Sequence, residues 1–112
     1  MAVNKKNDFD KDEQELAAFA NALSHPARIA ILKTLAKKDV CICGEIVEVL
    51  PLAQSTVSQH LRELCSAGVI TGTIDGPRSC YCINWKMFEK FEKTFSSFFA
   101  KSKSFEEKRN CC

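Results

Sequence analysis

The cysteines are the residues of this sequence with the most distinctive chemistry. Seven of them occur among 112 residues. They form two Cys-x-Cys pairs, one adjacent pair near the end of the chain and one single residue: Cys41 and Cys43, Cys80 and Cys82, Cys111 and Cys112, and Cys65. Thiolates bind soft metal ions in preference to hard ones, and two neighbouring thiols can oxidise to a disulfide. The pattern predicts soft-ion binding or redox chemistry.

The start of the chain indicates the compartment in which these thiols act. Residues 1–6, Met-Ala-Val-Asn-Lys-Lys, lead into a charged stretch without the apolar segment of a secretory signal. No run is long and apolar enough for a transmembrane helix. We therefore expect a cytoplasmic protein with reduced thiols and no membrane partner. Clustered cysteines in that compartment serve metal or redox chemistry more often than structural disulfides.

The composition is that of a globular domain, with 46% hydrophobic and 27% charged residues. The net charge of +2 is too small to indicate a nucleic-acid partner by itself, so DNA binding must come from local placement of charge. No Cys-x-x-Cys motif, Ser/His/Asp or Cys/His constellation, or glycine-rich phosphate loop is evident, so an enzyme is not expected. We expect one domain over residues 10–100, with a flexible arm at 1–9 and a flexible, Cys-ending tail at 101–112.

Hydrophobic periodicity predicts a mainly α-helical chain with one β-hairpin. Local signals mark the element ends, because proline suits the first turn of a helix and glycine its C-terminus. In chain order we expect a helix from Asp10, a helix from Pro26, a short β-favouring stretch at 40–42 able to add a strand beside the hairpin, a third helix from about Ile42 to Pro51, a fourth capped by Gln54 or Ser55 and ending at Gly68, hairpin strands at 69–74 and 78–83, and a last helix capped by Asn84.

The third and fourth helices, with the tight turn between them, have the pattern of a helix-turn-helix. The outer face of the fourth helix carries short side chains that both donate and accept hydrogen bonds. Such residues alone are also typical of a solvated helix face, but the hairpin that follows favours DNA, because a hairpin tip can contact the neighbouring groove or backbone. The expected contacts to double-stranded DNA are Gln54, Ser55, Thr56, Ser58, Gln59, His60 and Arg62, with Arg78 at the rim of the hairpin.

Three sequence runs in this order resemble the ArsR/SmtB family of metalloregulatory repressors: residues 23–32, 52–64 and 67–70. The resemblance extends over roughly residues 15–100. It implies a homodimeric winged helix-turn-helix fold, mainly α with a β-hairpin wing. It also implies a repressor that needs no cofactor to bind DNA and leaves its operator when an inducer binds.

The resemblance further implies that the first and last helices form the dimer interface. The residues support this, because four phenylalanines recur at steps of three and four along the last helix and exceed what a lone domain of this size covers easily. The expected interface residues are Leu16, Phe19, Phe88, Phe91, Phe95 and Phe98. A purely intramolecular core helix is the alternative.

Arsenic sensors of that family often carry Cys-x-Cys at the start of the third helix, with a further cysteine one turn on. Cys41 and Cys43 match this motif, whereas Ile46 occupies the place of the further cysteine. The resemblance thus implies trivalent arsenic, or a similar soft ion, as the inducer, held by Cys41, Cys43 and a third thiolate. We expect Cys111 or Cys112 to supply it, with Cys80 and Cys82 as the alternatives and Cys65 as a packing residue.

A Cys-x-Cys pair at a helix start would couple ion binding to DNA binding. Residues two apart on an α-helix point to nearly opposite sides, so one ion can bind both thiolates only if the first turn unwinds. Unwinding there would disturb the adjoining fourth helix, which carries most of the expected DNA contacts.

Two other functions fit parts of the sequence. The first keeps the fold and makes the chain a redox-sensing repressor in which cysteines oxidise to a disulfide. The second is a small metal or thiol carrier. Sequence-specific DNA binding would separate the ion-released and the redox-sensing repressor from the carrier, because a carrier would show no such binding.

Overall fold

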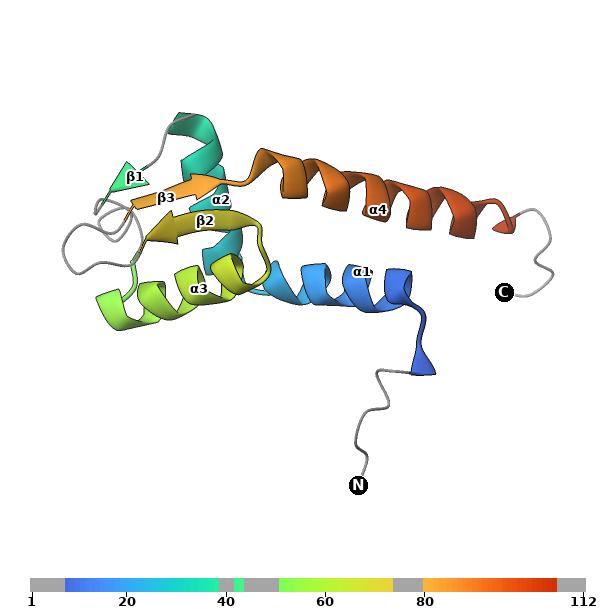
Figure 1. Ribbon diagram of the computed structural model, residues 1–112, viewed down its shortest axis with the longest axis horizontal. Coiled ribbons are helices and arrows are strands. Elements are labelled where there is room, and N and C mark those ends of the chain that lie inside the picture. The colour runs from blue at the N-terminus through green and yellow to red at the C-terminus, as the bar shows by residue number, and fades with distance from the viewer. Residues whose placement is uncertain (1–7, 39–41, 44–50, 74–79, 107–112) are drawn as a thin grey trace, which may run out of the picture.

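The computed structural model describes residues 8–38, 42–43, 51–73 and 80–106. Within these residues the chain forms four helices and a small sheet. The elements are α1 (Lys11–Ala22), α2 (Pro26–Lys38), β1 (Ile42–Cys43), α3 (Gln54–Ser66), β2 (Ile70–Thr73), β3 (Cys80–Ile83) and α4 (Trp85–Lys103). Figure 1 shows two of the helices, α2 and α3, beside the sheet. No helix among the described residues is both long and apolar enough to cross a bilayer.

Local signals fix several helix ends where the sequence predicts them. Asp10 caps α1, since its Oδ1 accepts a hydrogen bond from the Glu13 N–H at 2.8 Å and its own N–H donates to Glu13 Oε1 at 3.1 Å. Asn84 caps α4 by accepting the N–H three residues on at 3.2 Å. Gly68, just past the end of α3, has φ +80°, a conformation that glycine adopts without a Cβ penalty.

The three strands form an antiparallel sheet in the order β1-β3-β2. Alternate residues of a strand point to opposite faces, and in β3 this alternation is visible: Tyr81 and Ile83 are buried, whereas Cys80 and Cys82 are half-buried. We call the Tyr81 side the inner face and the Cys80 side the outer face. Gly72 lies opposite Tyr81, and a Cβ at Gly72 would come within 2.5 Å of the Tyr81 ring. The absence of a side chain there lets the ring pack into the core.

The core lies between the inner face of the sheet and the helices α2 and α3. Five of its side chains are less than 2% exposed: Ile31, Val57, Leu64, Val69 and Ile70. They come from α2, α3, β2 and the turn before β2, so a single hydrophobic cluster fixes α3 against the sheet.

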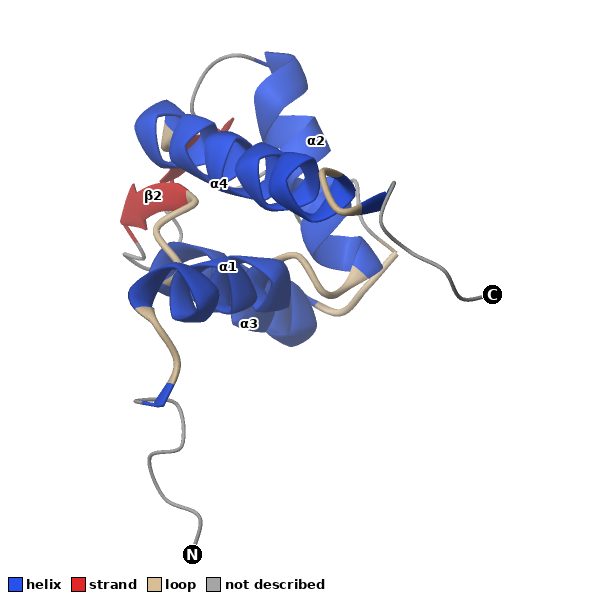
Figure 2. Cartoon of the chain, turned by 90° about the vertical axis from the view of Figure 1, so that its right-hand side faces the viewer, coloured by secondary structure: helices blue, strands red, loops and turns tan. Residues whose placement is uncertain are grey.

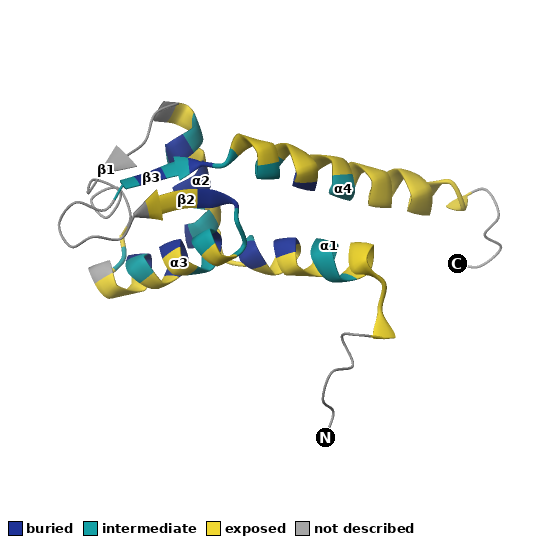
Figure 3. Cartoon of the chain, viewed as in Figure 1, coloured by how far each residue is buried: buried dark blue, intermediate teal, exposed yellow. Residues whose placement is uncertain are grey.

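Helices α1 and α4 lie side by side and extend together away from the sheet (Figures 1 and 2). Their contact is built on Phe19 and Phe91, whose rings stack with an interplanar angle of 16°. Towards its C-terminal end α4 is exposed on all sides (Figure 3). Phe98 and Phe99 there are 48% and 56% exposed.

Three sequence predictions need correction. Ile42 and Cys43 do not begin a helix but form a strand, because they pair with Tyr81 and Cys80 of β3. The rest of the expected third helix lies outside the described residues. Helix α3 begins after Ala53, and no side chain caps it. Helix α4 continues through Lys103, so a tail that begins at 101 would start inside it.

Candidate functional site

Helix α3 has one buried apolar side and one exposed polar side. Val57, Leu61 and Leu64 are buried against the core. The opposite side is exposed and carries most of the residues expected to contact DNA, namely Ser55, Thr56, Gln59 and Arg62, with Ser58 half-buried at its edge. Because the buried side is fixed by packing, the polar side has a defined orientation.

The first turn of α3 is suited to an anion. It contains no acidic residue, and the free N–H groups and the dipole of a helix N-terminus favour phosphate. Gln54 is the first residue of the helix. Arg78, expected at the rim of the hairpin, lies outside the described residues.

His60 does not belong to this exposed side, and the expectation that it contacts DNA is wrong. The side chain is only 6% exposed. Its Nδ1 accepts a hydrogen bond from Arg28 Nε at 3.1 Å, while its Nε2 has no partner among the described residues. Burial, followed by the nearby His25 and Arg28, lowers the pKa of His60 below the usual 6.5. His60 therefore serves as a neutral acceptor that positions α3.

Arg28 is the residue of this region that sequence analysis missed. Besides His60, it reaches the end of α1, where its Nη1 donates to the carbonyl oxygens of Asn21 at 3.1 Å and Ala22 at 3.5 Å. One guanidinium on α2 thus connects α2 with α1 and with α3. Its position directly after His25-Pro26-Ala27, in a run that carries the family resemblance, was the available signal.

Three of the four cysteines that the structure describes lie on the neighbouring strands β1 and β3. Cys43 of β1 is directly opposite Cys80 of β3, and Cys82 lies two residues further along β3. Cys80 and Cys82 are both disulfide-bonded in this structure, which differs from the expectation of reduced thiols. Cys41, Cys111 and Cys112 lie outside the described residues.

Cys65 stands apart from that group. It is half-buried on α3, packs against the core and is a free thiol. Burial raises the pKa of this thiol above its usual value, which disfavours the thiolate that binds ions. These features agree with the packing role expected for it.

The residues expected at a dimer interface divide into two groups. Phe19 and Phe91 are 4% and 5% exposed, because they already cover each other within one chain. Leu16, Phe88 and Phe95 are half-buried, and Phe98 is exposed. Of these six residues, Phe98 on the distal part of α4 therefore leaves the most apolar surface uncovered in a single chain.

Comparison with known proteins places the chain among transcription regulators. Residues 23–73 match a family model described as a helix-turn-helix domain. The HTH-type transcriptional repressor SmtB of Mycobacterium tuberculosis is 43% identical over 60 residues, which are 54% of this chain and 44% of that protein. This chain therefore spans less than half the length of that relative.

Two further relatives match more of their own length. The HTH-type transcriptional regulator YgaV of Escherichia coli is 34% identical over 70 residues, 62% of this chain and 71% of that protein. The arsenical resistance operon repressor of Staphylococcus xylosus is 28% identical over 76 residues, 68% of this chain and 72% of that protein.

Solved structures share the fold. An ArsR-like transcriptional regulator from Rhodococcus sp. RHA1 superposes with a TM-score of 0.65 at 23% identity, over 80% of this chain and 84% of that one. The match confirms the predicted arrangement of helices with a β-hairpin wing, and the relatives found by sequence are transcription regulators rather than enzymes.

Proposed function

The chain belongs to the ArsR/SmtB family of winged helix-turn-helix transcription regulators, and from that membership we propose that it is a repressor that binds operator DNA as a homodimer and leaves it when a soft ion binds its thiolates. The observation that carries the proposal is the combination of an exposed polar face on α3 with cysteines on the neighbouring sheet. Trivalent arsenic is the proposed inducer.

Support for DNA reading comes from α3. Its exposed side presents Ser55, Thr56 and Gln59, which can both donate and accept hydrogen bonds at base edges. The Arg28–His60 hydrogen bond and the core below hold that side in place. The symmetric pairing of two such helices would read half-sites about 10–10.5 base pairs, or a multiple of that, apart.

The test is a gel shift on DNA from upstream of the gene. Each of Gln59→Ala and Ser55→Ala is expected to weaken specific binding by about 1–3 kcal/mol, because a base contact is lost. Ser66→Ala is the matched control, since Ser66 is exposed at the other end of the same helix. Unchanged discrimination between operator and random DNA in both test variants would mean that another surface reads the sequence.

Support for a soft-ion inducer comes from the cysteines. Cys41 and Cys43 match the family's arsenic-sensor motif, and one relative is named an arsenical resistance operon repressor. Soft thiolates select soft ions such as trivalent arsenic. The coupling between ion and DNA is expected to reduce DNA affinity about 5- to 150-fold.

The inducer is tested by adding arsenite to the DNA complex under reducing conditions. Cys41→Ser and Cys43→Ser should each bind DNA normally and fail to release it. Cys65→Ala, which removes a thiol from α3, should respond as the unaltered chain does. Normal release from both serine variants would exclude these two residues as the sensor.

Redox sensing is the second candidate, and the disulfide-bonded state of Cys80 and Cys82 favours it. In this reaction two thiols lose two electrons and two protons to a peroxide, which is reduced to water or an alcohol and water. Peroxide treatment should then lower DNA affinity in step with the loss of free thiols. DNA affinity that stays constant while thiols disappear would exclude this candidate.

A further inference from the structure

The outer face of the sheet brings together three cysteines from strands far apart in the sequence. Cys43 and Cys80 are partners in the antiparallel pair of β1 and β3. Residues directly opposite in such a pair have Cβ atoms about 4.5–5.5 Å apart and share a face. Cys82 shares that face with Cys80, because residues two apart on a strand do.

We infer that the soft ion binds on this outer face, held by Cys43 of β1 and by Cys80 and Cys82 of β3. The inference rests on the proposed function and changes its ligand set: Cys80 and Cys82 of β3 take the places given there to Cys41 and to a C-terminal cysteine. A Cys41→Ser variant that still binds arsenite therefore supports this ligand set over the one taken from the family motif. Among the side chains that the structure describes, no three His, Cys, Asp or Glu residues cluster. Cys43 is assigned to this face by the strand register, which places it opposite Cys80.

Accessibility and surroundings fit an ion that arrives from solvent. Cys80 and Cys82 are half-buried, and the β2 residue opposite Cys82 is the exposed Thr71. Cys80 and Cys82 lie on the side of β3 opposite the buried Tyr81 and Ile83, so ligation by these two residues does not require the core to open.

The chemistry requires the reduced form of the chain. A cellular thiol supplies two electrons and two protons to each disulfide, giving two cysteine thiols while two of its own molecules form a disulfide. Arsenous acid, As(OH)₃, then exchanges its three hydroxyl groups for three cysteine sulfurs, and the three thiol protons leave with them as three waters. Oxidation of the same cysteines blocks the site, so the inducer acts only on the reduced chain.

A site in this position acts on the wing. Cys80 is the first residue of β3, and Arg78, expected to contact DNA, precedes it by two residues. An ion that binds β1 and the start of β3 together fixes the end of the hairpin next to its loop, where Cys80 pairs with Thr73 of β2. This replaces the unwinding of a helix start as the coupling device, because Cys43 lies in a strand.

The experiment uses the full chain, reduced with a phosphine that does not compete for the ion as a dithiol does. Arsenite is titrated in, and the sulfur-to-arsenic charge-transfer absorbance reports binding, while labelled operator DNA in parallel samples reports release. The variants are Cys80→Ser, Cys82→Ser and a chain ending at Asn110, with Cys65→Ala as the control.

Cys80→Ser and Cys82→Ser should each lose arsenite affinity by more than the about 10- to 100-fold that loss of an outer-shell partner costs. The chain ending at Asn110 and Cys65→Ala should bind as the unaltered chain does. If instead the shortened chain loses the absorbance and the two serine variants keep it, the inference is wrong and the proposed function stands with a ligand from the tail.

Alkylation of the unaltered chain gives a second measurement that needs no variant to fold. Arsenite should protect Cys43, Cys80 and Cys82 from iodoacetamide, and leave Cys111 and Cys112 as reactive as before. Protection of the last two residues in place of those of β3 overturns the inference. Protection of the sheet cysteines without DNA release supports the site and contradicts the proposed inducer function.

Discussion

The two ends of this molecule use their apolar side chains differently. The body, formed by α2, α3 and the sheet, encloses its core completely, and Ile31, Val57 and Leu64 are 0% exposed. The arm, formed by α1 and α4, leaves Phe98 and Phe99 about half exposed. A single chain therefore suffices to position α3, whereas the arm has apolar surface that only another surface can cover.

The arm itself changes along its length. Near the body, Phe19 and Phe91 stack and are buried, and Phe95 packs beside Phe19. Further along α4, beyond the end of this contact, the phenylalanines become exposed (Figure 3). The comparison thus predicts that the body determines the stability of one chain and the distal arm determines how chains associate.

The largest effect is expected from the body. Leu64→Ala should lower the free energy of unfolding by about 2–5 kcal/mol, because it removes a fully buried side chain and leaves a cavity. Leu16→Ala, which removes the same side chain from a half-buried position on α1, should cost less at protein concentrations where the chain is monomeric. Urea denaturation measures both, and equal losses would break the distinction between body and arm.

Association should depend on the distal arm. Phe98→Ser is expected to weaken the dimer by about 2 kcal/mol or more, roughly 30-fold in dissociation constant, if Phe98 is an aromatic anchor of the interface. Trp85→Ser is the control, since Trp85 is exposed to a similar degree at the other end of α4. Sedimentation equilibrium compares the two, and a stronger effect of Trp85→Ser would place the interface near the body instead.

Local signals made several helix ends in both the body and the arm predictable from the sequence. The caps at Asp10 and Asn84 and the left-handed Gly68 act within a few residues, so the helix ends they set were predicted. Contacts between distant residues were harder. Arg28 and His60 are 32 residues apart, and nothing local showed that His60 is buried.

The strand at Ile42 and the phenylalanine stripe illustrate the same limit. Ile42–Cys43 becomes a strand because β3, almost forty residues later, offers its edge. Phe91 and Phe98 lie on one stripe of α4, and spacing alone does not tell which of them α1 covers.

We expect acid to lower the free energy of unfolding of the body because of His60. Its pKa is lowered in the folded chain, so between that value and the usual 6.5 the unfolded chain binds the proton and the folded chain does not. The free energy of unfolding therefore falls as the pH drops below 6.5, and it has no such dependence above that pH. Protonation would also remove the acceptor for Arg28 Nε.

The comparison is made with His60→Asn, which keeps an acceptor near Nδ1 and does not titrate. Between about pH 7.5 and about pH 5.5, a range spanning the usual histidine pKa, urea denaturation should show a larger loss for the unaltered chain than for the variant. An identical loss in both would remove His60 as the source of acid sensitivity in the body.

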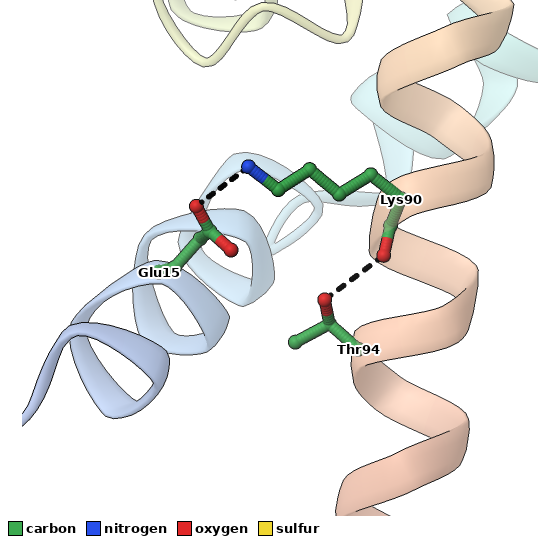
Figure 4. A network of polar contacts seen from close by, with 3 residues as sticks. All are labelled: Glu15, Lys90 and Thr94. Carbon is green, nitrogen blue, oxygen red and sulfur yellow. Dashed lines mark hydrogen bonds and ion pairs between the residues drawn. The ribbon is translucent and has the colours of Figure 1, made fainter.

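The smallest effect is expected from the ion pair that joins α1 to α4. Lys90 Nζ lies 3.0 Å from Glu15 Oε2, and Figure 4 shows this contact together with the hydrogen bond from Thr94 Oγ1 to the Lys90 carbonyl oxygen. The two ionic side chains are 53% and 39% exposed, so water and salt screen their attraction. Exposed pairs of this kind contribute about 0.2–1 kcal/mol.

A double-mutant cycle with Lys90→Met and Glu15→Gln measures the coupling between the two helices. The matched cycle uses Lys93 and Glu89, which are 3.4 Å apart within α4 and join no second element. Both couplings should be small and should shrink in about 1 M salt, where the screening length is near 3 Å. Because the stacked Phe19 and Phe91 rings are buried and the ion pair is not, ring packing should hold the arm together. A Lys90–Glu15 coupling well above about 1 kcal/mol that persists in salt would show that charge, and not apolar burial, pairs α1 with α4.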